Sequence, residues 1–465
     1  MNIPAFNKST AALTAAAIAD RGLLGVATLL TTVLIGRWAG PEELGLFSLF
    51  FPVAFAAIAL QESLITAPYT VFAAECAGAE DRRAYLGSVL VHTGALAAAL
   101  GGVFAVAALA LWLAGHPAYA AAAGVLAPVA PCVLLREFAR RVVYADLNPQ
   151  IAVAVSGGAS VLQLIAMAAL HAGGRLSAVS AFVAIGASSL LVGAAWTVLS
   201  GKRITVRRDL VKGHFSRNLH MGRWIAAAQV GDVVRIHMFP WLLALALDES
   251  SVGVYAACAA IAGLSGPLQI AISSILLPKF ALVEARGGMG AADRLMWQAT
   301  GWMVAAMALF TLAIGSVSGQ VVPFLYGAAY LGAQTPLVLL LMAQLVIGVS
   351  MPAARALVAL RRPDLDFITH MAGIGANLFL GAPLVLLQGV EGAAAAALIG
   401  AAVKAALTAA FYSRELRGGR LGSAAAEVQA VSLPVAPLPA TAVIGAPRGS
   451  YAAATTSHNW AEDRS

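Results

Sequence analysis

Charged residues are scarce in this chain, and their scarcity excludes most soluble proteins. Asp, Glu, Lys and Arg make up only 11% of the 465 residues, whereas about a quarter of a soluble domain is charged. Hydrophobic residues make up 60%, and the mean hydropathy is +0.84. A soluble protein could not bury that much apolar surface, but helices of about 20 apolar residues that cross a bilayer have this composition. We therefore expect a polytopic helical membrane protein and not a cytosolic enzyme.

Cysteine and the signatures of cofactor or metal chemistry are also nearly absent. Cys76, Cys132 and Cys258 have no CxxC or metal-ligand spacing, so neither a disulfide framework nor a metal site is expected. P-loop, HExxH and GxSxG motifs are missing, which argues against an ATP motor and common hydrolases. The DLD triplet at 364–366 has the DxD form of some glycosyltransferases, but it lies in a short loop without a catalytic domain. We expect no cofactor, no metal and no catalytic residue.

Apolar stretches long enough to span a bilayer recur along the chain. Their approximate ranges are 12–36, 44–66, 86–113, 118–138, 150–171, 177–199, 222–247, 252–277, 297–322, 333–354, 366–387 and 391–411. The first stretch carries Asp20 and Arg21 and continues to Ile35, which indicates an anchor and not a cleavable signal peptide. The expected fold is all-α, with about twelve transmembrane helices.

The distribution of positive charge predicts which side of the membrane each loop faces. With the N-terminus in the cytoplasm, cytoplasmic segments hold about 22 Lys and Arg, and the outer loops hold only Arg37 and Arg175. The formal charge of +7 is therefore an orientation signal, and no nucleic-acid partner is expected. Ala- and Arg-rich, Lys-poor usage is typical of a high-GC bacterium. We predict a multi-pass protein of the bacterial inner membrane with both termini in the cytoplasm.

The two halves of the chain resemble each other. Aligning residues 45–47 (Gly-Leu-Phe) with residues 253–255 (Gly-Val-Tyr) places Gln61 opposite Gln269. Two six-helix halves in the same orientation are typical of transporters with parallel repeats. The predicted divisions are an N-lobe at 1–200, a basic cytoplasmic linker at 201–218, a C-lobe at 219–412 and a cytoplasmic, mostly disordered Ala/Pro-rich tail at 413–465.

Polar residues inside the spans are the candidate functional residues, because a charge in hydrocarbon is costly unless it is paired or hydrated. Arg21 and Arg235 lie deep in the first helix of each half. Two buried arginines facing a cleft would form a cationic site for phosphate or an acidic sugar, so both are predicted to bind substrate. The candidates for ion coupling or for a polar cavity lining are Asp20, Gln61, Glu62, Gln229, Asp232 and Gln269.

Structural roles for the same charges remain open at this stage. The spacing of Asp232 and Arg235 also suits an intrahelical pair. Arg21 can extend to the cytoplasmic headgroups or bind Glu62. His237 lies on another face of the seventh span, where a satisfied structural histidine is the more common case.

Two stretches resemble a known family. LLTTVLIGRWAGPEELGLFSLFFPV (29–53) resembles the first two helices of polysaccharide-biosynthesis flippases, and GDVVRIHMFPWLLALALDESSVGVYAACAAIAGLSGPLQIAISSILLPKFA (231–281) resembles their seventh and eighth helices. The similarity extends over about residues 10–412. It indicates the polysaccharide-transporter branch of the multidrug/oligosaccharidyl-lipid/polysaccharide (MOP) exporter superfamily.

The resemblance implies two six-helix lobes that form a V around a central cavity, which opens alternately to each side. It also implies a flippase that moves a polyprenyl-pyrophosphate-linked oligosaccharide to the outer leaflet, driven by an ion gradient. Arg21 and Arg235 are the best matches to the family's cavity cations. The implied partners are the lipid-linked oligosaccharide, membrane lipids and glycan polymerase or export machinery. Peptidoglycan-precursor flippases have two more helices, which argues against lipid II as the cargo.

Two other functions compete with this one. A drug/cation antiporter of the same superfamily needs an acidic cavity, and the balanced set of intramembrane charges leaves that function open. A membrane glycan polymerase or ligase needs sizeable outer loops, whereas the outer loops here have only about four to ten residues. The enzyme is therefore the less favoured alternative.

Overall fold

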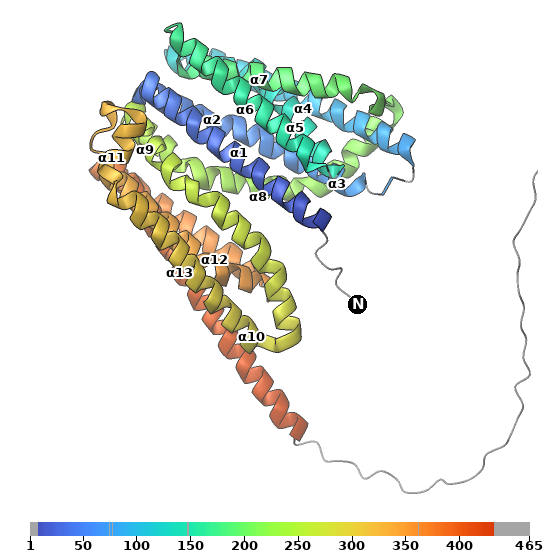
Figure 1. The fold of residues 1–465 in the computed structure, drawn as a ribbon, viewed down its shortest axis with the longest axis vertical. Helices are drawn as coiled ribbons and strands as arrows, with labels where there is room; N and C mark the ends of the chain where they lie inside the picture. The colour runs from blue at the N-terminus through green and yellow to red at the C-terminus, as the bar shows by residue number, and fades with distance from the viewer. Residues whose placement is uncertain (1–7, 74, 77, 147, 361, 432–465) are drawn as a thin grey trace, which may run out of the picture. The chain divides into compact units, whose positions relative to one another are not determined.

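Helices are the regular elements of the part of the chain that the structure describes (Figure 1). This structure is a computed structural model, and it describes residues 8–73, 75–76, 78–146, 148–360 and 362–431. The α-helices are α1 (Lys8–Trp38), α2 (Pro41–Gln61), α3 (Ala67–Phe72), α4 (Ala79–Leu113), α5 (Pro117–Ala145), α6 (Pro149–Ala172), α7 (Ala178–Leu199), α8 (Arg208–Ala246), α9 (Glu249–Ala262), α10 (Gly266–Ser316), α11 (Ser318–Tyr326), α12 (Gln334–Ala359) and α13 (Pro363–Val431). Short π or 3-10 segments are η1 (Glu62–Thr66), η2 (Gly201–Arg203), η3 (Gly263–Ser265) and η4 (Ala328–Tyr330).

Proline and glycine set the ends of these helices. Each of α2, α5, α6 and α13 begins with a proline, whose fixed φ suits the first helical position. Both α10 and α13 contain one glycine with a positive φ, Gly288 at 65° and Gly389 at 60°. That conformation interrupts an α-helix and is open mainly to glycine. Each of these long elements is therefore two helices joined at a glycine.

The twelve predicted spans all have helical counterparts among the described residues. Nine segments are long and apolar enough to cross a membrane. The last of them, Pro363–Arg417, is divided at Gly389, and Gly22–Trp38 and His237–Ala246 are shorter apolar helices. The predicted all-α, multi-pass architecture with about twelve helices is confirmed.

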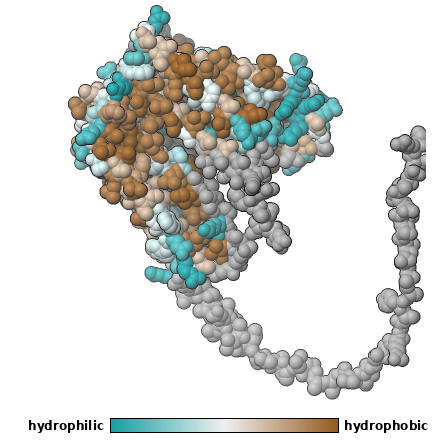
Figure 2. All heavy atoms as spheres, viewed as in Figure 1, coloured by the Kyte–Doolittle hydropathy of each residue, from teal (hydrophilic) through white to brown (hydrophobic). Residues whose placement is uncertain are grey.

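Large apolar side chains cover much of the outer surface, as Figure 2 shows for one face. Trp302 is 78% exposed, Phe379 83% and Leu387 80%. A soluble monomer rarely exposes so much apolar surface, whereas lipid chains solvate it well. The exposed apolar surface agrees with a protein that lies in a bilayer.

Helices α2 and α9 cross at a reciprocal glycine contact. A Cβ on Gly45 would lie 1.8 Å from the carbonyl oxygen of Glu249, and a Cβ on Gly253 would lie 2.0 Å from that of Pro41. Each glycine thus packs against the residue four positions before the other glycine. Since Gly45 and Gly253 are the residues aligned by the sequence repeat, the contact has the approximate two-fold symmetry expected of two related halves.

Further contacts join the two halves near this crossing, on the side predicted to face outward. The Tyr119 hydroxyl donates to Glu249 Oε1 at 2.6 Å. Arg37 donates to the carbonyl oxygen of Phe324, and Thr32 Oγ1 lies 3.2 Å from the Tyr326 hydroxyl. On this side of the molecule, the ends of α1, α2 and α5 are therefore attached to α9 and α11.

On the opposite side, the first turns of α8 pack against the N-terminal half. The Tyr85 hydroxyl donates to Asn218 Oδ1 at 2.6 Å, and His214 Nδ1 lies 2.9 Å from Ser88 Oγ. A Cβ on Gly222 would lie 2.3 Å from the carbonyl oxygen of Ser63. The basic segment predicted as a linker at 201–218 therefore includes the 3-10 turn η2 and the start of α8.

The end of the chain forms a second unit by its contacts, Arg417–Ser465. Helix α13 continues to Val431, so the first part of the segment predicted to be a tail is helical. Residues 432–465 lie outside the described residues. The predicted domain boundaries stay predictions.

Candidate functional site

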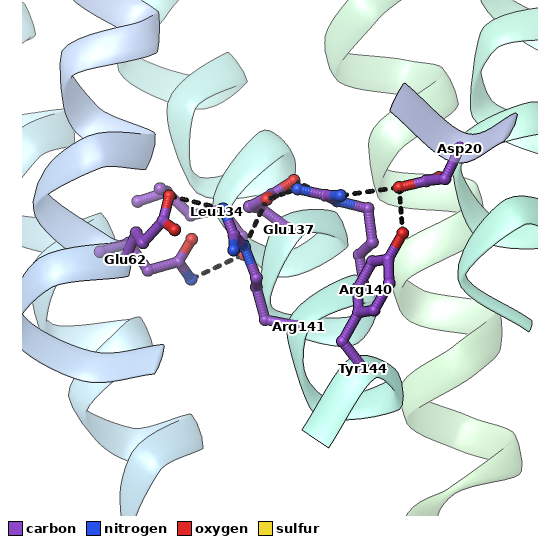
Figure 3. Close-up of polar contacts among 8 residues, drawn as sticks. Asp20, Glu62, Leu134, Glu137, Arg140, Arg141 and Tyr144 are labelled. Carbon is purple, nitrogen blue, oxygen red and sulfur yellow. Dashed lines mark hydrogen bonds and ion pairs between the residues drawn. The ribbon is translucent and has the colours of Figure 1, made fainter. Parts of the chain in front are cut away.

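A cluster of charged residues lies near the end of α5, inside the helix bundle (Figure 3). Glu137, Arg140 and Arg141 follow one another at intervals that place them on one side of the helix. Arg140 Nη1 donates to Asp20 Oδ2 of α1 at 2.9 Å, and its Nε donates to Glu137 Oε2 at 3.0 Å. Arg140 is 4% exposed and Asp20 is fully buried.

A second arginine extends the cluster to the second span. Arg141 Nη2 lies 2.5 Å from Glu62 Oε2, and its Nε donates to Glu137 Oε1 at 3.1 Å. Glu62 begins the π-helical segment η1, and such π-bulges occur frequently at functional sites. The Tyr144 hydroxyl also donates to Asp20, at 2.7 Å. Three carboxylates and two arginines thus tie α1, η1 and α5 together.

This network changes the environment of two predicted coupling residues. Asp20 and Glu62 are each bound to an arginine, so a proton or cation would have to compete with that arginine for the carboxylate. Glu62 has Arg141 as a partner. The alternative pairing of Glu62 with Arg21 is not tested, because the side chain of Arg21 lies outside the described residues. The coupling roles of Asp20 and Glu62 stay predictions.

Glu137 and Arg140 are two cluster residues that the sequence does not single out. The apolar pattern predicts that the fourth span ends at residue 138 and that Arg140 and Arg141 are cytoplasmic, but α5 continues to Ala145 and buries Arg140. Positive-inside counting treats an arginine near the end of a span as exposed. The available signal was Glu137, an acidic residue three and four positions before the two arginines.

The two glutamines that the repeat aligned have the same role in both halves. Gln61 Nε2 donates to the carbonyl oxygen of Leu134 on α5 at 2.8 Å. Gln269 Nε2 donates to Gln344 Oε1 on α12 at 3.2 Å. Both glutamines are buried, at 0% and 6% exposure. Each one links the second span of its half to the fourth, because α12 holds the fourth span of the C-terminal half.

The other predicted site residues are placed only in part. Arg21 belongs to α1, and Asp232 and Arg235 belong to α8, but the side chains of all three lie outside the described part of the structure. Gln229 is half-buried on α8. The predicted substrate-binding roles of Arg21 and Arg235 stay predictions.

A cavity of about 270 Å³ lies within the N-terminal half, next to the charged cluster. Its charged lining residues are Glu62, Arg136, Glu137, Arg140 and Arg141. The polar side chains of α6 that line it are Ser156, Ser160 and Gln163. This cavity therefore contains both signs of charge, and ion pairs hold both of its carboxylates.

A larger cavity of about 440 Å³ is lined by residues of both halves. Helices α1 and α2 contribute Thr28, Thr32 and Ser48, and α8 contributes His237. From the C-terminal half come the polar side chains Gln344, His370, Asn377 and Lys404. A cavity lined by both halves was expected from the family resemblance.

The charged groups on the wall of this large cavity are cationic or basic. Lys404 Nζ lies 2.9 Å from His370 Nε2. Asp366 lies on the other side of the imidazole, with its Oδ1 3.6 Å from His370 Nδ1. No Asp or Glu belongs to the described lining of the large cavity. The described lining of the larger cavity therefore offers charged partners to an anion and none to a cation.

Comparison with known proteins gives a fold but no close relative. No family model matches the sequence, and no curated protein matches it either. Solved structures do match. An inward-facing multidrug resistance MATE family transporter of the MOP superfamily aligns with a TM-score of 0.71 at 14% identity, covering 85% of this chain and 95% of that one. The lipid II flippase MurJ in an inward closed conformation aligns with a TM-score of 0.64 at 14% identity, covering 85% and 86%.

These similarities show that the chain has the fold of MATE and MurJ transporters. An outward-facing MATE family transporter aligns with a TM-score of 0.61 at 14% identity, covering 89% of this chain and 96% of that one.

Proposed function

We propose that this protein is an alternating-access flippase that moves a polyprenyl-pyrophosphate-linked oligosaccharide, or a related polysaccharide precursor, across the bacterial inner membrane. The shared fold supports a transporter that exposes its cavity to one side at a time. In this proposal the termini are cytoplasmic, and glycan polymerase or export machinery receives the product.

The lining of the large cavity is the observation that carries the proposal. It offers Lys404, His370 and His237 and, among described residues, no carboxylate. A pyrophosphate group needs cationic and hydrogen-bonding partners, and the described lining provides them without a carboxylate among its residues. Arg21 and Arg235 would add two further cations from the first helix of each half, as the sequence predicts.

The N-terminal half favours a second candidate, a drug/cation antiporter. The MATE transporter with the TM-score of 0.71 is named as a multidrug resistance protein. The small cavity also contains Glu62 and Glu137, and carboxylates attract cationic drugs. Their ion pairs with Arg140 and Arg141 lower that attraction, so the flippase remains the preferred function.

Deletion of the chromosomal copy tests the two candidates against each other. For a flippase, surface polysaccharide is lost and its lipid-linked precursor accumulates at the cytoplasmic face. Unchanged glycan with increased sensitivity to cationic drugs would overturn the proposal. In the complemented strain, Arg235→Ala should abolish export while the membrane level of the protein stays normal. Normal export by that variant would show that Arg235 has only a structural role.

A further inference from the structure

The two limbs of α13 approach each other closely along a track of glycines. The limbs are joined at Gly389. A Cβ on Gly373 would lie 3.1 Å from the carbonyl oxygen of Gly400 and 3.3 Å from Lys404 Cβ. A Cβ on Gly400 would lie 1.9 Å from Asn377 Oδ1. Because neither glycine carries a side chain, the limbs can pack at this distance and bring Lys404 over to His370.

The contact between Lys404 and His370 has one consistent arrangement of protons when Lys404 is an ammonium group. An ammonium group only donates hydrogen bonds, so His370 Nε2, 2.9 Å from Lys404 Nζ, must accept one. The imidazole proton is then on Nδ1, which lies 3.1 Å from the carbonyl oxygen of Asp366. In this state the pair holds one positive charge. A second proton, on Nε2, would place an imidazolium beside an ammonium group, and an anion between the two groups would lower their repulsion.

The neighbouring charged groups support this arrangement. Arg355 on α12 lies 3.8 Å from Asp366. Its positive charge offsets the charge of the Asp366 carboxylate, which lies beside the imidazole of His370. On α10, Asp293 accepts from Tyr412 at 3.5 Å and belongs to a separate contact. On α8, His237 lines the same cavity, and the side chains of Asp232 and Arg235 lie outside the described residues.

The same wall has polar groups that folding alone does not satisfy. Asn377 Oδ1 is buried without a hydrogen-bond partner among the described atoms. As an acceptor it calls for a donor such as water, and only the Nδ2 group of Asn377 can donate to an anion. Asn377 lies two turns after His370 on the same limb, and both line the large cavity. Gln344 of α12 lines it as well.

We propose that Lys404 and His370 form a proton-linked binding site for a doubly charged phosphate-type anion on the C-terminal wall of the large cavity. The anion bridges Lys404 Nζ and His370 Nε2, and His370 takes up one proton from solvent as the anion binds. The two cations repel each other less once the anion lies between them, so proton binding and anion binding strengthen each other. This inference rests on the proposed function, because it places the pyrophosphate of the lipid carrier at this wall.

Sulfate binding to the purified full-length protein tests the site. Sulfate is a suitable probe because its charge does not change between about pH 6 and pH 8, where histidine titrates. The wild type should bind sulfate about tenfold or more tightly at pH 6 than at pH 8, since one linked proton gives up to about tenfold per pH unit. Calorimetry in buffers of different ionisation heat should show proton uptake on binding.

Matched variants separate the two roles. His370→Gln keeps an acceptor for Lys404 but cannot take up the proton, so its sulfate affinity should lose the pH dependence. His237→Gln, on the same cavity, should keep it. Lys404→Met should bind sulfate more than about tenfold more weakly at both pH values, and Lys404→Arg should recover binding, because an anion contact of this kind is charge-assisted.

Three results would overturn the inference: pH-dependent binding that survives in His370→Gln, wild-type binding in Lys404→Met, or pH-independent binding in the wild type. If Lys404→Met is not monodisperse on size exclusion, the pH profiles of His370→Gln and His237→Gln decide the matter. Sulfate binding does not measure glycan export. If sulfate binding fails these tests but export is lost in the deletion strain, the proposed flippase stands and only the binding site is rejected. If sulfate binds as expected but the deletion strain still exports the glycan, the flippase is rejected and the binding site stands.

Discussion

The charged clusters of the two halves are built differently. In the N-terminal half, Arg140 is buried among carboxylates from α1 and α5, so its charge is used to hold helices together. In the C-terminal half, Lys404 and His370 are only half-buried and line the large cavity. Buried ion pairs are costly to break and contribute little when intact, whereas groups on a cavity wall can bind solutes. We therefore propose that the cluster around Arg140 mainly stabilises the fold and that the pair of Lys404 and His370 binds the solute.

Removing the central arginine should give the largest loss of stability. Arg140→Met leaves Asp20 buried without its cation and removes one of the two arginine partners of Glu137, which should cost about 3–5 kcal/mol. The measurement is thermal unfolding in detergent, together with the membrane level of the protein. His370→Gln in the other half should cost about 1 kcal/mol or less. Arg217→Met, which removes a half-exposed pair with Glu75, is the control and should cost about 0–1 kcal/mol. Similar losses of stability in Arg140→Met and His370→Gln would contradict the proposed difference between the two halves.

The glycine crossing should be the next most sensitive feature. In Gly45→Val, a side chain would meet the carbonyl oxygen of Glu249, so α2 and α9 must separate at the predicted outer end. Ser48 lines the large cavity, so Ser48→Cys in a chain without its native cysteines can report access to that cavity. In cells, this cysteine should react faster with an impermeant maleimide when Gly45→Val is also present than when Gly45 is kept. Gly253→Val should have the same effect because the contact is reciprocal.

A glycine with free space around it provides the control for that labelling. A Cβ on Gly102 would have no neighbouring atom within 4 Å, so Gly102→Ala should leave the labelling rate of Ser48→Cys unchanged. Equal rates in all three glycine variants would mean that the crossing does not close the outer side.

The paired glutamines offer a smaller and symmetric test. Gln61→Leu leaves the carbonyl oxygen of Leu134 without its side-chain donor, and Gln269→Leu does the same to Gln344. Each should lower the free energy of unfolding by about 0.5–1.5 kcal/mol, the net contribution of one hydrogen bond. A loss in only one of the two variants would contradict the equivalence of the halves at this level.

The smallest expected effect concerns the start of α8. Burial, with His92 and Arg217 nearby, lowers the pKa of His214 below its ordinary value. The neutral imidazole is thus favoured in the folded state, so its contribution to stability is present above the ordinary pKa of about 6.5 and is lost as the pH falls towards the lowered pKa. Amide exchange of residues 208–222, corrected for intrinsic rates, should rise on acidification. His214→Gln should flatten this dependence.

Much of the fold could be predicted from the sequence, because lipid requires long apolar helices and the spans stand out by composition alone. The repeat paired Gly45 with Gly253, and the structure shows that these two residues also lie in contact, which the sequence did not predict. Periodicity and spacing predict helices and the residues that share a helix face, because both are properties of one helix.

The candidate site could be predicted only in part, because it depends on contacts between distant segments. The pair of Lys404 and His370 forms because Gly389 joins two limbs and Gly373 lets them approach. The sequence of neither limb predicts the distance between Lys404 and His370. The burial of Arg140 likewise depends on Asp20, 120 residues away.

Transport in proteoliposomes tests the central claim most directly. The purified protein would be reconstituted and given a polyprenyl-pyrophosphate-linked oligosaccharide on one side and, in parallel, a lipophilic cation such as tetraphenylphosphonium. We predict translocation of the pyrophosphate-linked glycan, its loss in Lys404→Met and no protein-dependent movement of the cation. Cation transport without glycan translocation would contradict the proposed flippase.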